Sequence, residues 1–204
     1  MRYSAGVIMP ENVPQLADRS LFPELQAVAY LNHAAISPPS TPVLKAVAGV
    51  THDYATRGLG ALMDTLAIRD RLRRRLARLI SVDPSDVGMC PSTTRGIADI
   101  ALAINWKPGD RIIVFTGEFP ANVTPWQQVA RTFALELVFV SLEGFARNPE
   151  EGLAALEQAL PGTRLVAVSM VQFQTGLRMP ICEMTALCHG YGAEILVDAV
   201  QGVG

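Results

Sequence analysis

Short apolar stretches recur along the chain from residue 87 onward, and segments with helical spacing separate them. Each stretch is apolar at consecutive positions, which is typical of strands that are buried on both faces of a sheet. The stretches that predict strands lie at 87–90, 111–116, 135–142, 164–171 and 194–200.

The segments between these stretches predict helices. Residues 93–104 and 124–133 have helical spacing, and another helix runs from about 180 to 190 or 192. Asn148 is typical of an N-cap, since Pro149 follows it at the first helical position. Strands that alternate with helices predict an α/β fold, a three-layer sandwich with a mainly parallel sheet. Ligands bind such sheets at the carboxyl ends of the strands, so we expect a functional site there.

The first part of the chain has a different pattern. Up to about Gly60 it is rich in loops, and prolines between residues 38 and 42 stiffen it. Apolar residues at spacings of mostly three or four then predict a helix over 66–80. Arginines crowd this helix, which would suit a nucleic-acid-binding surface. Because the outer face of an amphipathic helix is usually solvated or paired with acids, we interpret them as a solvated face.

The composition limits the class of protein. Half of the residues are hydrophobic, 18% are charged and the formal net charge is −2. A core can form, and nothing attracts nucleic acid or an anionic membrane in general. We find no membrane-spanning stretch and no signal peptide at the start of the chain. Three cysteines without metal-ligand spacing indicate a cytoplasmic protein without a metal site, and we expect Cys182 and Cys188 in the core.

Polar residues follow the first predicted strand. Ser92, Thr93 and Thr94 lie where a helix begins, and exposed N–H groups at that point form a natural phosphate site. The alternative is that these hydroxyl groups only cap the helix, which is the commoner role.

Further functional groups follow the later strands. Phe119 lies in a loop, where it could cover a flat ring or pack on the protein's own helices. Gln172 is placed for hydrogen bonding after one strand, and Asp198 lies near the end of the last strand, three residues before Gln201. A buried acid needs donors or a cation, which a helix or a protonated heterocycle would supply. A phosphate cup, an aromatic plate, amides and a carboxylate together fit pyridoxal phosphate.

The chain contains five motifs in this order: YLNHAAISPPS, PSTTRGI, GEFPANVTPW, VSMVQFQTG and ILVDAVQGVG. Their order and spacing are typical of class V aminotransferases, and the chain resembles this family from about Tyr30 to its last residue. The family contains pyridoxal-phosphate enzymes such as cysteine desulfurases and isopenicillin-N-epimerase-like proteins. The resemblance implies the large cofactor domain of a fold-type I transferase, a homodimer and an amino-acid substrate whose identity stays open.

The resemblance also implies roles for single residues. Thr93 and Thr94 resemble the phosphate-binding pair, and Phe119 is similar to the position that stacks on the pyridine ring. Asn32 and His33 resemble the loop that lines the substrate side.

Three further residues resemble groups that contact the ring of the cofactor. Gln172 and Gln201 are similar to side chains that reach the 3-oxygen of the ring. Asp198 resembles the aspartate that pairs with the pyridine nitrogen and keeps it protonated, so that the ring accepts electrons.

The lysine that binds the cofactor in this family is absent. The chain has only Lys45 and Lys107, and neither lies in the family's histidine–lysine motif. The resemblance therefore implies that this chain has no catalytic Schiff-base lysine and holds pyridoxal phosphate by non-covalent contacts at best.

The resemblance also predicts how the chain is organised. We expect residues 1–60 to form a loop-rich segment that lines the substrate side, and residues 61–204 to form a partial cofactor-binding domain. The fold would then be incomplete, and the chain a truncated or inactive form of the enzyme. The alternative is a non-catalytic binding or interaction module derived from the same fold.

Overall fold

The computed structural model describes residues 18–203, and the expectation about a signal peptide concerns a segment outside them. The chain divides into two compact units, Met1–Leu72 and Arg73–Gly204, which we describe separately. The functional boundary that we expect between residues 60 and 61 stays a prediction.

The described residues of the first unit, 18–72, form loops and helices. A short 3-10 helix, Arg19–Leu21, precedes the loop that leads to α1 (Thr41–Arg57). Gly58 ends α1 with a positive φ of 52°, a conformation that glycine adopts without strain. A 3-10 turn (Gly58–Ala61) then leads into α2 (Leu62–Ile80), whose residues from Arg73 on belong to the second unit, so the helix predicted from residue 66 begins four residues earlier.

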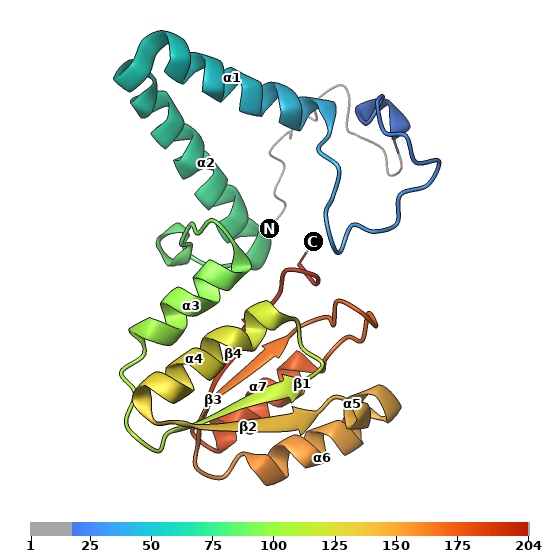
Figure 1. The fold of residues 1–204 in the computed structure, drawn as a ribbon, viewed down its shortest axis with the longest axis vertical. Helices are drawn as coiled ribbons and strands as arrows, with labels where there is room; N and C mark the ends of the chain where they lie inside the picture. Colours follow the sequence, from blue (N-terminus) through green and yellow to red (C-terminus); the bar gives the residue numbers. More distant parts are fainter. Residues whose placement is uncertain (1–17, 204) are drawn as a thin grey trace, which may run out of the picture. The chain divides into compact units, whose positions relative to one another are not determined.

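The second unit is built on a parallel sheet of four strands in the order β2-β1-β3-β4 (Figure 1). The strands are β1 (Arg111–Thr116), β2 (Glu136–Ser141), β3 (Thr163–Ser169) and β4 (Glu194–Asp198). Each of them lies within a stretch that the sequence predicts as a strand or within one residue of it.

Helices cover both faces of this sheet, which makes the three layers (Figure 1). On one face α3 (Thr93–Ala103) and α4 (Thr124–Phe133) pack against alternate residues of β1, Ile112 and Val114. On the other face α5 (Glu143–Arg147), α6 (Pro149–Ala159) and α7 (Ile181–Gly190) pack against Ile113 and Phe115. The predicted three-layer fold with a parallel sheet is confirmed.

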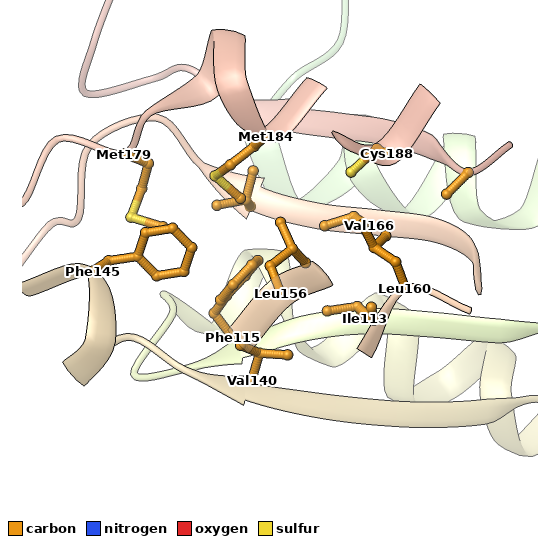
Figure 2. Close-up of a cluster of buried hydrophobic side chains, with 12 residues drawn as sticks. Ile113, Phe115, Val140, Phe145, Leu156, Leu160, Val166, Met179, Met184 and Cys188 are labelled. Atoms are coloured by element: carbon orange, nitrogen blue, oxygen red, sulfur yellow. The ribbon is translucent and has the colours of Figure 1, made fainter. Parts of the chain in front are cut away.

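Figure 2 shows the second of these cores, in which Phe145, Leu156 and Met184 converge on the strands. The contact between α5 and α6 is close because glycines meet there. A Cβ atom on Gly144 would lie 3.2 Å from the backbone of Gly152, and one on Gly152 would lie 2.3 Å from Cγ of Phe145. Glycine at these positions therefore lets α6 pack directly against α5 and against the Phe145 ring.

One predicted strand is wrong. Residues 87–90 form no strand, and Gly88, Met89 and Cys90 are exposed. A strand needs a neighbour to pair its backbone N–H and C=O groups, and among residues 18–203 no other strand pairs with this segment. The carbonyl oxygen of Val87 instead accepts a hydrogen bond from Nε of Arg73 at 3.1 Å.

The capping prediction for α6 is confirmed. Asn148 has an extended conformation, and its Oδ1 accepts a hydrogen bond from the backbone N–H of Glu150 at 3.0 Å. Pro149 occupies the first turn, where its missing N–H costs nothing. Among the cysteines, Cys188 is buried as expected, whereas Cys182 is exposed, so the prediction of a core position for Cys182 is wrong.

Candidate functional site

The order of the strands marks where a ligand would enter. The connection from β1 runs through α4 to β2 on one side, whereas β3 lies on the other side of β1 and continues through α7 to β4. Loops that leave two neighbouring parallel strands in opposite directions open a crevice at the carboxyl ends of those strands. The loops after β1 and β3 are therefore the place to look for binding groups.

A buried carboxylate connects these two loops. Glu118 follows β1, is 7% exposed, and accepts three hydrogen bonds from the end of β3. Its Oε1 accepts from the backbone N–H of Ser169 at 2.7 Å and from Nε2 of Gln172 at 3.0 Å. Its Oε2 accepts from the Ser169 hydroxyl group. Charge-assisted hydrogen bonds of this kind are among the stronger ones in proteins, so they fix the two strand ends together.

A tight hairpin after β3 holds Gln172. Its backbone N–H donates to the carbonyl oxygen of Leu177 at 2.9 Å, and its own carbonyl oxygen accepts from the N–H of Gly176 at 2.8 Å. Gly176 has a φ of 70°, which permits the turn. The Gln172 side chain is 3% exposed, and its Oε1 is buried without a hydrogen-bond partner in the described structure.

An aromatic pair lies across the same two loops. The rings of Phe119, after β1, and Phe173, after β3, meet edge to face with centroids 5.0 Å apart. Phe119 keeps 46% of its surface exposed, so one part of the ring is covered by Phe173 and another part remains open to a flat partner.

Asn122 adds a second buried amide to the loop after β1. It is fully buried at the end of a 3-10 helix, Pro120–Asn122, and its Oδ1 accepts from Nε1 of Trp126 at 3.2 Å. Trp126 is also fully buried, and the Nδ2 atom of Asn122 has no hydrogen-bond partner among the described residues. The indole thus fixes which way the Asn122 amide points.

Asp198 joins this group through the sheet. It ends β4, is 8% exposed, and pairs in register with Ser169, the residue that bonds to Glu118. Its Oδ1 accepts from the backbone N–H of Val200 at 3.1 Å. Gln201 lies in the turn that follows, and a Cβ atom on the neighbouring Gly202 would lie 2.6 Å from Sδ of Met170, so this turn packs against the end of β3.

Thr93 and Thr94 lie in the first turn of α3, where backbone N–H groups have no partners within the helix. Ser92 is the N-cap, because its Oγ accepts from the N–H of Arg95 at 3.2 Å. The capping alternative therefore holds for Ser92. α3 contacts the 3-10 helix Pro120–Asn122, which follows Phe119 directly.

Asn32 and His33 belong to the first unit. Both are exposed, and the His33 ring lies edge to face with Tyr30 at 5.1 Å while its Nδ1 is 3.1 Å from the Ser37 hydroxyl oxygen. Their assignment to the substrate side stays a prediction, as do the roles of Thr93, Thr94 and the other residues named from the sequence.

Sequence reasoning missed Glu118 and Asn122. Both lie inside the quoted motif GEFPANVTPW, and a charged residue directly before an apolar loop was a signal that could have drawn attention to Glu118. The order of the strands in the sheet decides which strand end the Glu118 carboxylate reaches, and hydrophobic patterns in one sequence do not reveal that order.

Residues 18–203 contain neither a metal-ligating cluster nor a membrane-spanning helix. No group of three or more His, Cys, Asp or Glu residues there could hold a metal ion. None of the described helices combines the length and the apolar character needed to cross a membrane.

Curated relatives match most of this chain. A cysteine desulfurase of Cronobacter sakazakii is 32% identical, in a match that covers 91% of this chain and 48% of the relative. Cysteine desulfurases of Klebsiella pneumoniae and of Escherichia coli O7:K1 are also 32% identical, over 87% and 86% of this chain and 45% of each relative. The chain spans about half the length of the curated relatives that it matches.

Solved structures share the fold. A lysine-to-alanine variant of C-DES, with glycine covalently linked to its PLP cofactor, superposes with a TM-score of 0.82 at 26% identity, covering 92% of this chain and 50% of that one. A complex of the cystine C-S lyase C-DES with its reaction product cysteine persulfide gives a TM-score of 0.75 at 26% identity, over 85% and 47% of the two chains. The model of the aminotransferase class-V family matches residues 29–204. The chain belongs to the class V aminotransferase family.

Proposed function

We propose that this chain binds pyridoxal phosphate at the carboxyl ends of β1, β3 and β4, as the cofactor-binding part of an enzyme that acts on an amino acid. The observation that carries the proposal is the buried cluster of Glu118, Gln172 and Asp198 at neighbouring strand ends. Family membership and the cofactor of the C-DES structure support the same ligand.

The residues present fit this cofactor chemically. Phe119 offers an exposed ring surface to a flat pyridine ring, and the buried Oε1 of Gln172 lacks the donor that a buried polar atom normally has. Asp198 supplies a carboxylate for a ring nitrogen, and Gln201 a side-chain amide in the adjacent turn. The first-turn N–H groups of Thr93 and Thr94 suit a phosphate.

Each of these groups has a defined task in the proposal. Bound pyridoxal phosphate supplies an electron sink for a carbanion at the α-carbon of an amino acid. Asp198 holds the proton on the pyridine nitrogen, because a nearby negative charge favours the charged form of the ring. Phe119 excludes water from one face of the ring, and the amides orient it in its plane.

Within the second unit, no described lysine lies at these strand ends. Lys45 lies in α1, and Lys107 precedes β1 at the amino-terminal edge of the sheet, opposite to the strand ends that carry the cluster. We therefore infer that these 204 residues hold the cofactor without a covalent bond and do not turn over an amino acid by themselves. The homodimer expected from the family is part of the same proposal.

Equilibrium titration of the purified chain with pyridoxal phosphate, followed by absorbance and by tryptophan fluorescence, tests the proposal. We expect saturable binding that dialysis reverses and that borohydride does not trap on the protein. Asp198→Asn should weaken binding about tenfold, since it removes the charge opposite the ring nitrogen. The matched control is Glu194→Gln at the exposed start of the same strand, which should bind as the unchanged chain does.

The outcomes separate the alternatives. Absence of binding in a folded chain would refute the cofactor site and favour the interaction module. A borohydride-stable adduct at one to one would refute the inference that binding is non-covalent.

A further inference from the structure

We propose that Glu118 is a positioning residue, which fixes the side-chain amide of Gln172 so that Oε1 is presented to the ligand as an acceptor. This inference rests on the proposed function, because the ligand concerned is the cofactor at the carboxyl ends of β1 and β3. It assigns a role to a residue that does not itself need to touch the ligand.

The geometry determines the orientation of the amide. A carboxylate at neutral pH only accepts hydrogen bonds, whereas a glutamine amide donates through Nε2 and accepts through Oε1. Because Nε2 of Gln172 lies 3.0 Å from Oε1 of Glu118, the opposite orientation would place two acceptors against each other. A glutamine without such a neighbour rotates between the two orientations at little cost.

The carboxylate is itself held in place from the neighbouring strand. The backbone N–H of Ser169 donates to Oε1 at 2.7 Å, and the Ser169 hydroxyl group donates to Oε2. Both oxygens of Glu118 are therefore engaged, and the side chain is 7% exposed. Because both carboxylate oxygens are hydrogen-bonded and protein encloses the side chain, Glu118 keeps its position whether or not a ligand occupies the site.

The unpaired oxygen of Gln172 is the consequence of this arrangement. Burial of an acceptor without a donor costs about 1–3 kcal/mol, and native structures rarely accept that cost without a reason. The fixed orientation presents Oε1 as an acceptor. The group that meets this oxygen must therefore be a donor, namely an O–H or N–H group of the ligand or an ordered water, rather than a bare anion that only accepts.

The test compares Glu118→Met, Ser169→Ala and the control Glu194→Gln in the full chain. A methionine at position 118 has a similar volume but offers no oxygen acceptor to Nε2 of Gln172, so the amide is free to turn over. We expect Glu118→Met to shift the side-chain NH₂ resonances of Gln172 in ¹H–¹⁵N spectra and to weaken pyridoxal phosphate binding about tenfold. Ser169→Ala keeps the pair of Glu118 and Gln172, so it should leave those resonances in place and weaken binding at most about threefold.

A second readout separates positioning from a general loss of structure. The absorbance maximum of bound pyridoxal phosphate follows the ionisation of its ring hydroxyl group, so a changed partner at that oxygen should move the maximum in Glu118→Met but not in Ser169→Ala. Unchanged Gln172 resonances in Glu118→Met would overturn the positioning role. Changed resonances together with unaltered affinity and absorbance would overturn the link to the ligand.

The same experiment keeps the two proposals apart. Failure of the unaltered chain to bind pyridoxal phosphate would refute the proposed function, and with it the ligand role of Gln172. Normal binding by the unaltered chain and equally by Glu118→Met would leave the proposed function intact and refute this inference alone.

Discussion

A methyl group added to Gly152 tests the packing of α5 on α6. A Cβ atom there would lie 2.3 Å from Cγ of Phe145 and 2.4 and 2.6 Å from the two Cδ atoms. Carbon atoms in contact normally lie about 3.5–4.0 Å apart, so the ring would have to move by more than about 1 Å. Phe145 is 3% exposed and meets the Phe115 ring edge to face at 5.9 Å, which leaves it little room.

The magnitude follows from two opposing effects. Overpacking of a core typically costs about 1–3 kcal/mol, whereas alanine in place of glycine inside a helix stabilises it by about 1 kcal/mol. The size of the overlap puts the packing cost at the upper end, so we expect Gly152→Ala to lower the free energy of unfolding by about 2 kcal/mol. In a Phe145→Ala background the obstacle is absent, and the same change should raise it by up to about 1 kcal/mol.

Urea unfolding followed by circular dichroism measures all four proteins of this cycle. The matched control is Gly190→Ala at the end of α7, where an added Cβ atom meets nothing within 4 Å, so the free energy of unfolding should stay the same or rise by up to about 1 kcal/mol. A destabilisation of equal size with and without the Phe145 ring would refute the reasoning, since the cost would then not come from the ring.

Two other predictions concern buried polar groups. Trp126→Phe leaves Oδ1 of the buried Asn122 without a donor and should lower the free energy of unfolding by about 1–3 kcal/mol. Adding Asn122→Leu removes the unpaired amide, so the double variant should recover part of that loss in urea unfolding. Effects of the two substitutions that simply add would contradict this expectation. Burial raises the pKa of the Cys188 thiol to about 11, so at pH 8 only about 0.1% of it is thiolate. Cys90 and Cys182 should therefore react with Ellman's reagent in the native protein while Cys188 does not, and rapid labelling of all three would contradict the burial of Cys188. The free energy of unfolding should fall as the pH rises from about 9 through 11, because the thiol of Cys188 ionises at a lower pH in the unfolded chain than in the folded one.

Hydrophobic patterns predicted most of the sheet because buried strands and amphipathic helices have different periods. β1 and β3 are apolar at consecutive positions because both of their faces are buried. One face of the sheet packs on α3 and α4, and the other packs on α5, α6 and α7. The same rule failed at 87–90, where an apolar stretch lacks a neighbouring strand in the described structure. Pairing between strands is a tertiary property, and a short apolar run does not contain it.

The candidate site was predictable only in part, for a related reason. The positions of Phe119, Gln172 and Asp198 after strands follow from the pattern, and the roles assigned to them stay predictions. The bonds from Glu118 to Ser169 and Gln172 span 51 and 54 positions of sequence, and they depend on β3 lying next to β1 rather than next to β2. Because β3 follows β2 in the sequence, chain order alone would place β3 next to β2.

The long sequence separation across the Glu118 bridge has a thermodynamic consequence. No local fragment can form this junction, so a ligand that binds there finds its site only in the assembled sheet and none in the unfolded chain. Because the ligand binds only the folded state, its binding raises the free energy of unfolding, by about 2.7 kcal/mol when the ligand is at 100 times its dissociation constant. The strand ends and the sheet would melt as one linked equilibrium, in which the ligand acts as a structural component of the domain.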